Sequence, residues 1–126
     1  MKTLADYVNE AKAVTEEIEP ARAAAEGNLL LDVREAAELG AEGALEGALH
    51  VPRGLLEAKA DPASPVRDER LVAAREENET IDVFCAVGAR GVMAAMTLGE
   101  MGYRARNIAG GIKAWKEAGL PVSADG

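Results

Sequence analysis

Short apolar runs separated by stretches of helical composition make up most of the chain. Three runs have a composition typical of strands: Leu29–Val33, Ile81–Cys85 and Arg106–Ile108 with its neighbours. A weaker fourth run, Ala48–Val51, stops at Pro52. Periodicity alone cannot distinguish runs this short from helices, but the helical stretches between them favour strands. Strands that alternate with helices need crossover connections, so the pattern predicts an α/β fold with a parallel sheet and helices on both faces.

Three stretches between and after these runs are expected to be helices. Arg90–Met101 carries few charges, so we expect it to pack against the sheet over much of its circumference. Val66–Asn78 has its apolar residues on one side and is expected to be an amphipathic surface helix. Ile112–Ala118 follows a pair of glycines and is the third stretch expected to be a helix. The segment Lys59–Pro65 contains two prolines and is expected to be a loop.

The N-terminal segment follows helical spacing from Leu4 as far as Ile18. Pro20 interrupts this pattern, because it disfavours a helical residue before it and suits the first turn of a new helix, expected at Ala21–Glu26. We expect a single domain over residues 1–126, with an N-terminal helical extension at about residues 1–13.

Composition and charge exclude several classes of protein. The chain has 126 residues, with 14 Lys and Arg against 22 Asp and Glu, and its net charge is −8. This acidic balance disfavours nucleic acids and anionic membranes as partners. No apolar run approaches the roughly 20 residues that a membrane span needs.

Cysteine and histidine each occur once. These counts exclude an internal disulfide and a multi-thiolate metal site, and we expect neither a metal nor another cofactor. No secretory signal is visible at the N-terminus, so a cytoplasmic location is expected.

The segment around Cys85 carries the candidate chemistry. Cys85 lies at the carboxyl end of a predicted strand, where open α/β sheets bind ligands. Gly88 can adopt positive φ and curl the following amides into an anion-binding nest, and Arg90 adds a cation at the start of a helix. These features favour thiolate over thiol, which makes Cys85 a candidate nucleophile. The backbone amides expected to face the sulfur belong to Ala86, Val87, Gly88, Ala89 and Gly91.

A bare cysteine at a strand end is more often a small buried hydrophobe than a nucleophile. The sequence that follows Cys85 reverses this expectation, because a structural cysteine does not require Gly88 and Arg90 at a helix start.

Three ordered motifs resemble those of the rhodanese (sulfurtransferase) family. The loop Cys85-Ala-Val-Gly-Ala-Arg-Gly91 resembles the family's Cys-x-x-Gly-x-Arg loop. Leu30–Glu35, with Glu38 shortly after, resembles its Asp-Val-Arg-Glu signature, and Asn107–Val122 resembles its closing Gly-Gly-x-x-x-Trp motif. The resemblance covers about residues 14–122. It implies a five-stranded parallel sheet with helices on both faces, and it favours a short edge strand near Thr15–Ile18.

One segment departs from the family pattern. Many relatives read Gly-His-Ile-Pro-Gly-Ala where this chain reads Gly43-Ala-Leu-Glu-Gly-Ala48. The missing His and Pro belong to a structural turn, so we expect changed local rigidity rather than lost catalysis.

The resemblance implies that Cys85 accepts a sulfur atom from thiosulfate or a persulfide donor and passes it to a thiol or cyanide through a Cys85 persulfide. The loop amides would hold this persulfide, and Arg90 would orient the loop or the donor. Asp32 and Arg34 are interpreted as a supporting charge network on the neighbouring strand, and Arg53 and Lys59 as solvated surface cations. A protein that donates or accepts a persulfide is a further candidate partner.

Two other functions stay open. A cysteine phosphatase or arsenate reductase also places a thiolate beneath amides, but has five residues between Cys and Arg, whereas four separate Cys85 from Arg90. A persulfide carrier with low turnover would share the same loop as the enzyme.

Overall fold

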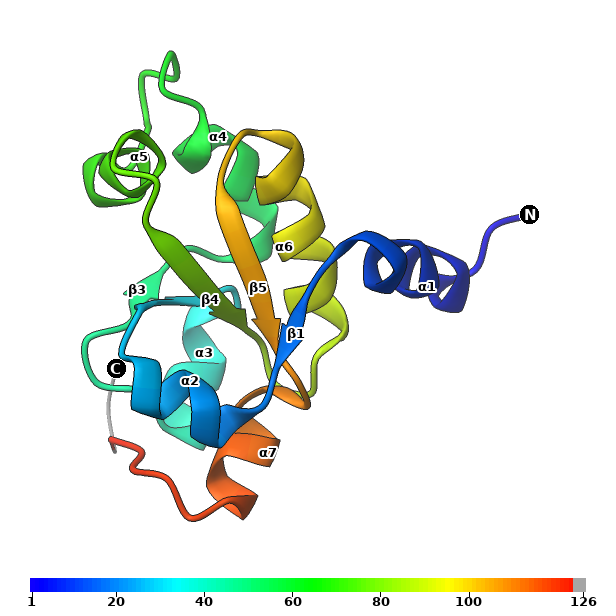
Figure 1. The fold of residues 1–126 in the computed structure, drawn as a ribbon, viewed down its shortest axis with the longest axis vertical. Coiled ribbons are helices and arrows are strands. Elements are labelled where there is room, and N and C mark those ends of the chain that lie inside the picture. The colour runs from blue at the N-terminus through cyan, green and yellow to red at the C-terminus, as the bar shows by residue number, and fades with distance from the viewer. Residues whose placement is uncertain (124–126) are drawn as a thin grey trace.

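A five-stranded, all-parallel sheet forms the centre of the computed structural model, which describes residues 1–123 (Figure 1). The strand order is β1-β5-β4-β2-β3, and every neighbouring pair is parallel. The strands are β1 Glu17–Ile18, β2 Leu29–Asp32, β3 Leu49–His50, β4 Thr80–Phe84 and β5 Arg104–Ile108. This sheet confirms the predicted fold class.

Helices cover both faces of the sheet (Figure 1). The apolar core under α4, α5 and α6 lies on one face, and α2 and α7 pack over a second core on the other. Helix α1 packs against α6. The helical elements are α1 Leu4–Val14, α2 Pro20–Glu26, α3 Ala36–Glu42, the 3-10 turn η1 Arg53–Leu55, α4 Leu56–Ala60, α5 Glu69–Glu76, α6 Ala89–Glu100 and α7 Gly111–Glu117.

Alternation along β4 divides its side chains between the two cores. Ile81 and Val83 belong to the core beneath α6, and Phe84 belongs to the core beneath α7. Cys85, directly after the strand, continues the alternation and lies in the first core with Val83. Strand pairing places β2 directly beside β4, with Asp32 opposite Phe84. The carboxyl ends of these two strands therefore carry the residues that the sequence singles out.

The edge strand implied by the family resemblance is present, and the helical spacing through Ile18 does not continue the first helix. Helix α1 ends at Val14, and Thr15 is extended. Glu17 and Ile18 then pair with Asn107 and Ile108 of β5. The physical reason lies in the residues around Pro20, because Pro disfavours a helical residue before it and opens α2 as its first residue.

Other element boundaries differ from the sequence expectations. Lys59 and Ala60 end helix α4, so the expected loop over residues 59–65 begins only at Asp61. The expected surface helix is shorter than residues 66–78, because the Asp68 side chain accepts a hydrogen bond from the Leu71 amide at 2.9 Å and caps α5 there. Helix α3, whose seven residues include no buried ones, has no counterpart among the predicted helices.

Within residues 1–123, no helix is both long and apolar enough to cross a membrane. The same part of the chain contains no group of three or more His, Cys, Asp or Glu side chains arranged to hold a metal ion.

Candidate active site

Cys85 is the first residue after β4, at the carboxyl edge of the sheet. Its side chain is 1% exposed and lies in the apolar core that contains Val33 and Val83. Burial alone is equally compatible with a structural cysteine. The polar groups around the sulfur therefore decide whether Cys85 is a candidate nucleophile.

The loop after Cys85 turns back so that one amide meets the sulfur. Gly88 has φ +118 and forms the N-cap of α6, as the sequence predicts. Its N–H donates to Cys85 Sγ at 3.0 Å. Within residues 1–123 this is the only hydrogen bond recorded to the sulfur. That the amides of Ala86, Val87, Ala89 and Gly91 hold a transferred sulfur stays a prediction.

Arg90 is fixed by an ion pair with Glu38 of α3. Its two terminal nitrogens donate to the two carboxylate oxygens at 2.7 and 2.8 Å, and Glu38 also accepts the Glu35 amide at 2.8 Å. The hydrogen bonds from Arg90 lower the pKa of Glu38 from 4.5 to about 2, and the same pair raises the pKa of Arg90. Arg90 therefore ties the start of α6 to α3 and keeps a fixed cation beside the loop.

Asp32 and Arg34 form the charge network expected at the end of the neighbouring strand. Both side chains are buried, and Arg34 Nη2 donates to Asp32 Oδ2 at 2.8 Å. The same guanidinium donates to the Gly43 carbonyl at 2.8 Å, and the Arg34 carbonyl lies 2.7 Å from His50 Nε2. A buried charge is tolerated when it is paired and hydrogen-bonded in this way. The pair braces the turn that follows α3.

Helix α7 docks directly on the backbone of the loop. The amides of Ile112 and Lys113 donate to the carbonyls of Cys85 and Ala86 at 2.9 and 3.1 Å. A Cβ at Gly111 would lie 2.4 Å from the Cys85 carbonyl oxygen, closer than real Cβ atoms approach. The second glycine of the Gly-Gly motif therefore allows α7 to support the loop.

Asn107 of β5 contacts the loop after Cys85, and nothing in the sequence motifs assigns it a role. Its buried side-chain amide donates to Glu17 Oε2 at 2.9 Å and to the Gly88 carbonyl at 3.3 Å. A Cβ at Gly91 would lie 2.3 Å from Asn107 Oδ1. The available signal was a polar residue near the end of a buried strand, next to the strand that carries Cys85. Glu38 likewise belongs to a sequence motif that does not reveal its role.

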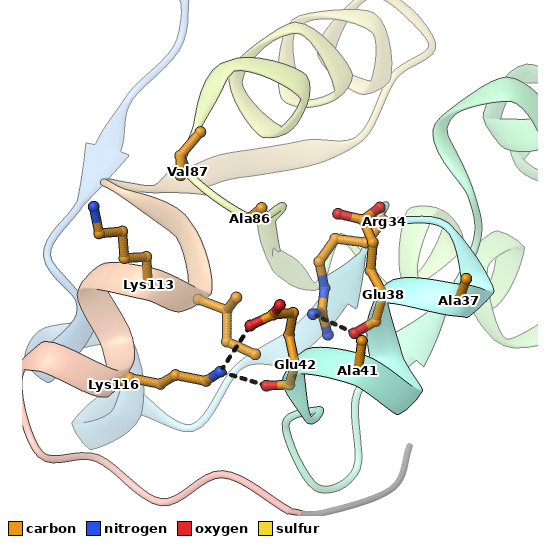
Figure 2. Close-up of a pocket in the computed structure, with 10 residues that line it drawn as sticks. Arg34, Ala37, Glu38, Ala41, Glu42, Ala86, Val87, Lys113 and Lys116 are labelled. Carbon is orange, nitrogen blue, oxygen red and sulfur yellow. Dashed lines mark hydrogen bonds and ion pairs between the residues drawn. The ribbon is translucent and has the colours of Figure 1, made fainter.

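A pocket of about 580 Å³ opens beside the loop, between α3 and α7, and is here called the α3–α7 pocket (Figure 2). Ala86 and Val87 of the loop line it, and Ala41 and Ile112 contribute to its apolar walls. Figure 2 shows Lys116 of α7 reaching across to α3, where its ammonium group contacts the Glu42 carbonyl and lies 3.8 Å from the carboxylate.

Arg53 and Lys59 do not line this pocket. Arg53 donates to Glu57 at 3.1 Å and to the Thr97 hydroxyl at 3.2 Å, and Lys59 lies in α4.

The family model for the rhodanese-like domain matches residues 11–118. The chain belongs to the rhodanese family. This rhodanese domain is 35% identical to a sulfurtransferase of Allochromatium vinosum over 97 residues, 76% of this chain and 78% of that protein. It is 37% identical to the human thiosulfate:glutathione sulfurtransferase over 92 residues, 70% of this chain and 78% of the relative. These findings confirm the resemblance stated from the motifs.

Solved structures show the same fold. A Rhodopseudomonas palustris protein of unknown function, described as a possible tyrosine phosphatase, superposes on the rhodanese domain with a TM-score of 0.87. The two are 28% identical, and the match covers 97% of this chain and 95% of that chain. A rhodanese-related protein of Thermoplasma volcanium has a TM-score of 0.70 at 26% identity, with 87% of this chain and 99% of that chain covered.

Proposed function

We propose that this rhodanese domain is a sulfurtransferase in which Cys85 carries the transferred sulfur as a persulfide. The observation that carries the proposal is the hydrogen bond from the Gly88 amide to Cys85 Sγ, inside a Cys-x-x-Gly-x-Arg loop. An amide donor at the start of a helix stabilises negative charge on sulfur, which is the reactive form of cysteine. The names of the two relatives support the reaction class, and that of the human relative supports thiosulfate as donor and a small thiol as acceptor.

The first half-reaction loads the protein. The Cys85 thiolate attacks the outer sulfur of thiosulfate and forms a new S–S bond. The S–S bond of thiosulfate breaks, and sulfite leaves with its electron pair. Cys85 then carries a persulfide anion, and the total charge is unchanged. A thiol or cyanide removes the outer sulfur in a second step, so ping-pong kinetics are expected.

The loop that follows Cys85 would also have to hold the persulfide. The outer sulfur of a persulfide lies about 2.05 Å beyond Sγ. In the unloaded protein the Gly88 amide donates to Sγ itself. We propose that the remaining amides from Ala86 to Gly91 meet the outer sulfur.

Phosphatase activity is the weaker candidate, although a structural neighbour is described in those terms. A cysteine phosphatase loop has one more residue between Cys and Arg to surround a tetrahedral oxyanion. In this chain both terminal nitrogens of Arg90 are bonded to Glu38. That arrangement favours a fixed structural cation over one that binds phosphate oxygens.

Steady-state assays of the purified chain and a Cys85→Ser variant test the proposal. We expect the wild type to move sulfur from thiosulfate to cyanide and to a small thiol with ping-pong kinetics. Cys85→Ser should lose at least about 10³-fold in rate, because the nucleophile is gone, while its melting temperature stays close to that of the wild type. Full activity in Cys85→Ser, or faster hydrolysis of an aryl phosphate than sulfur transfer in the wild type, would contradict it.

Loading the chain with thiosulfate and then adding cyanide or a small thiol distinguishes a low-turnover carrier from the enzyme. A carrier would load with sulfur from thiosulfate and keep it in the presence of cyanide or small thiols, whereas the proposed enzyme would discharge it rapidly.

A further inference from the structure

Lys113 differs from the other charged residues of the α3–α7 pocket. Three ion pairs account for the other charged side chains that line it: Arg34–Asp32, Arg90–Glu38 and Lys116–Glu42. The Lys113 side chain is exposed, and across residues 1–123 its ammonium group has no recorded ion-pair partner. The pocket therefore has one uncompensated charge, and that charge is positive. This is notable in a chain with a net charge of −8, which repels anions elsewhere.

The backbone fixes Lys113 beside the reacting residue. Its amide donates to the Ala86 carbonyl, while that of its neighbour Ile112 donates to the Cys85 carbonyl. Figure 2 shows the Lys113 side chain on the Val87 side of the pocket and Lys116 at the Glu42 side. The uncompensated cation therefore belongs to the end of the pocket that the loop forms.

The size and lining of the pocket point to an organic ligand. Its volume is about 580 Å³, whereas a small inorganic anion displaces only a few water molecules of about 30 Å³ each. Ala37, Ala41 and Ile112 provide apolar wall between the charged groups. Such a pocket suits an aliphatic chain that ends in an anionic group.

We propose that the α3–α7 pocket is the acceptor site and that Lys113 selects low-mass thiols that bear a carboxylate. This inference rests on the proposed sulfurtransferase function. The carboxylate binds the Lys113 ammonium group, and the thiol approaches the loop past Ala86. The acceptor thiolate then attacks the outer sulfur of the Cys85 persulfide and forms a new S–S bond. The bond between that sulfur and Cys85 Sγ breaks, and its electron pair returns to Cys85 as thiolate.

Single-turnover discharge of the persulfide-loaded chain tests the assignment. Mass spectrometry would follow the loss of the added sulfur to 3-mercaptopropionate and to the neutral 2-mercaptoethanol. We expect the ratio of the two rates to fall about tenfold in Lys113→Gln and further in Lys113→Glu, because one charge-assisted contact is lost or reversed. Lys59→Gln removes the same charge from α4, away from the pocket, and should keep the ratio within about twofold of wild type.

An unchanged ratio in both Lys113 variants would overturn the inference while the sulfurtransferase function stands. A wild type that neither loads nor discharges would instead contradict the proposed function. In that case, a binding measurement tests the role of Lys113 independently of sulfur transfer. In ligand-observed NMR with the unreactive thioether 3-(methylthio)propionate, the Cys85→Ser chain should bind several-fold more tightly than the same chain with Lys113→Gln. Equal binding would overturn the acceptor site on its own.

Discussion

Gly111 has no side chain, and this lets helix α7 approach the backbone of the loop after Cys85 closely enough to support it. Gly111 has φ +63, and an added Cβ would lie 2.4 Å from the Cys85 carbonyl oxygen and 2.6 Å from the Ala86 carbonyl. These atoms belong to the backbone, so they cannot move aside as a flexible side chain would. Substitution at this position must therefore displace α7 from the loop.

Gly111→Ala is expected to lower the free energy of unfolding by about 2–4 kcal/mol, through steric overlap and a strained backbone. Urea denaturation would measure the change. Gly99→Ala is the matched control, because Gly99 lies within α6 with open space at its Cβ position and no positive φ. That substitution should stabilise the chain by about 0.5–1 kcal/mol. Equal effects from the two variants would show that α7 does not need the close approach.

At the scale of elements, the pair between Glu38 and Arg90 joins α3 to the start of α6. Helix α3 contributes no buried residue to the core. Its position beside the loop therefore depends on polar contacts, among which this pair has two hydrogen bonds shorter than 3 Å.

Acid titration of stability tests this connection. The pKa of Glu38 is about 2 in the folded chain against an ordinary value of 4.5. The unfolded chain binds the proton more readily, so the pair stabilises the fold above about pH 4.5 and the contribution is lost as pH falls toward 2. Glu38→Gln should lower the free energy of unfolding by about 1 kcal/mol at neutral pH, and the difference from wild type should shrink over that window.

Chemical denaturation at a series of pH values between 2 and 7 would give both curves. Glu57→Gln is the control, because Glu57 pairs with Arg53 through a side chain that is 57% exposed, and exposed pairs contribute little. A difference between wild type and Glu38→Gln that stays constant from pH 7 to pH 2 would contradict the role given to the pair.

At the scale of the whole molecule, α1 is an addition to a sheet that is complete without it. The first strand begins at Glu17, after α1 has ended at Val14. The helix packs on α6 and buries Ala11, but Leu4 and Val14 remain 65% and 73% exposed. A chain that lacks residues 1–14 should therefore still fold as a five-stranded domain.

Thermal unfolding of this truncated chain would check the prediction. We expect one cooperative transition, with a melting temperature about 5–10 °C lower because the contact with α6 is lost. Loss of the cooperative transition would show that α1 belongs to the folding unit rather than extending it.

The sequence predicts the fold better than it predicts the details of the site. The apolar runs at β2 and β4 indicate their strands because most of their residues are buried and apolar, whereas β5 begins with exposed Arg104 and is apolar mainly at its end. Helix α3 leaves no such pattern, because nothing in it is buried. The strand β1 has only two residues, so periodicity could not identify it, and the family motifs were needed.

Within the site, the sequence predicts features formed by residues close together in the chain. It does not predict which distant residues pair with them. Gly88, close in sequence to Cys85, was correctly expected to take positive φ. The partner of Arg90 is Glu38, which lies 52 positions earlier in the chain. Asn107 likewise reaches Glu17 across 90 positions. Such pairs depend on how the strands are ordered in the sheet, and one sequence does not contain that information.

Intact-protein mass spectrometry would show whether Cys85 carries a transferred sulfur atom. The wild type and Cys85→Ser would each be incubated with thiosulfate, desalted and weighed. Because the chain has a single cysteine, we expect the addition of one sulfur atom to the wild type, removable by cyanide, and none to Cys85→Ser. No addition to the wild type, or equal addition to both proteins, would contradict this expectation.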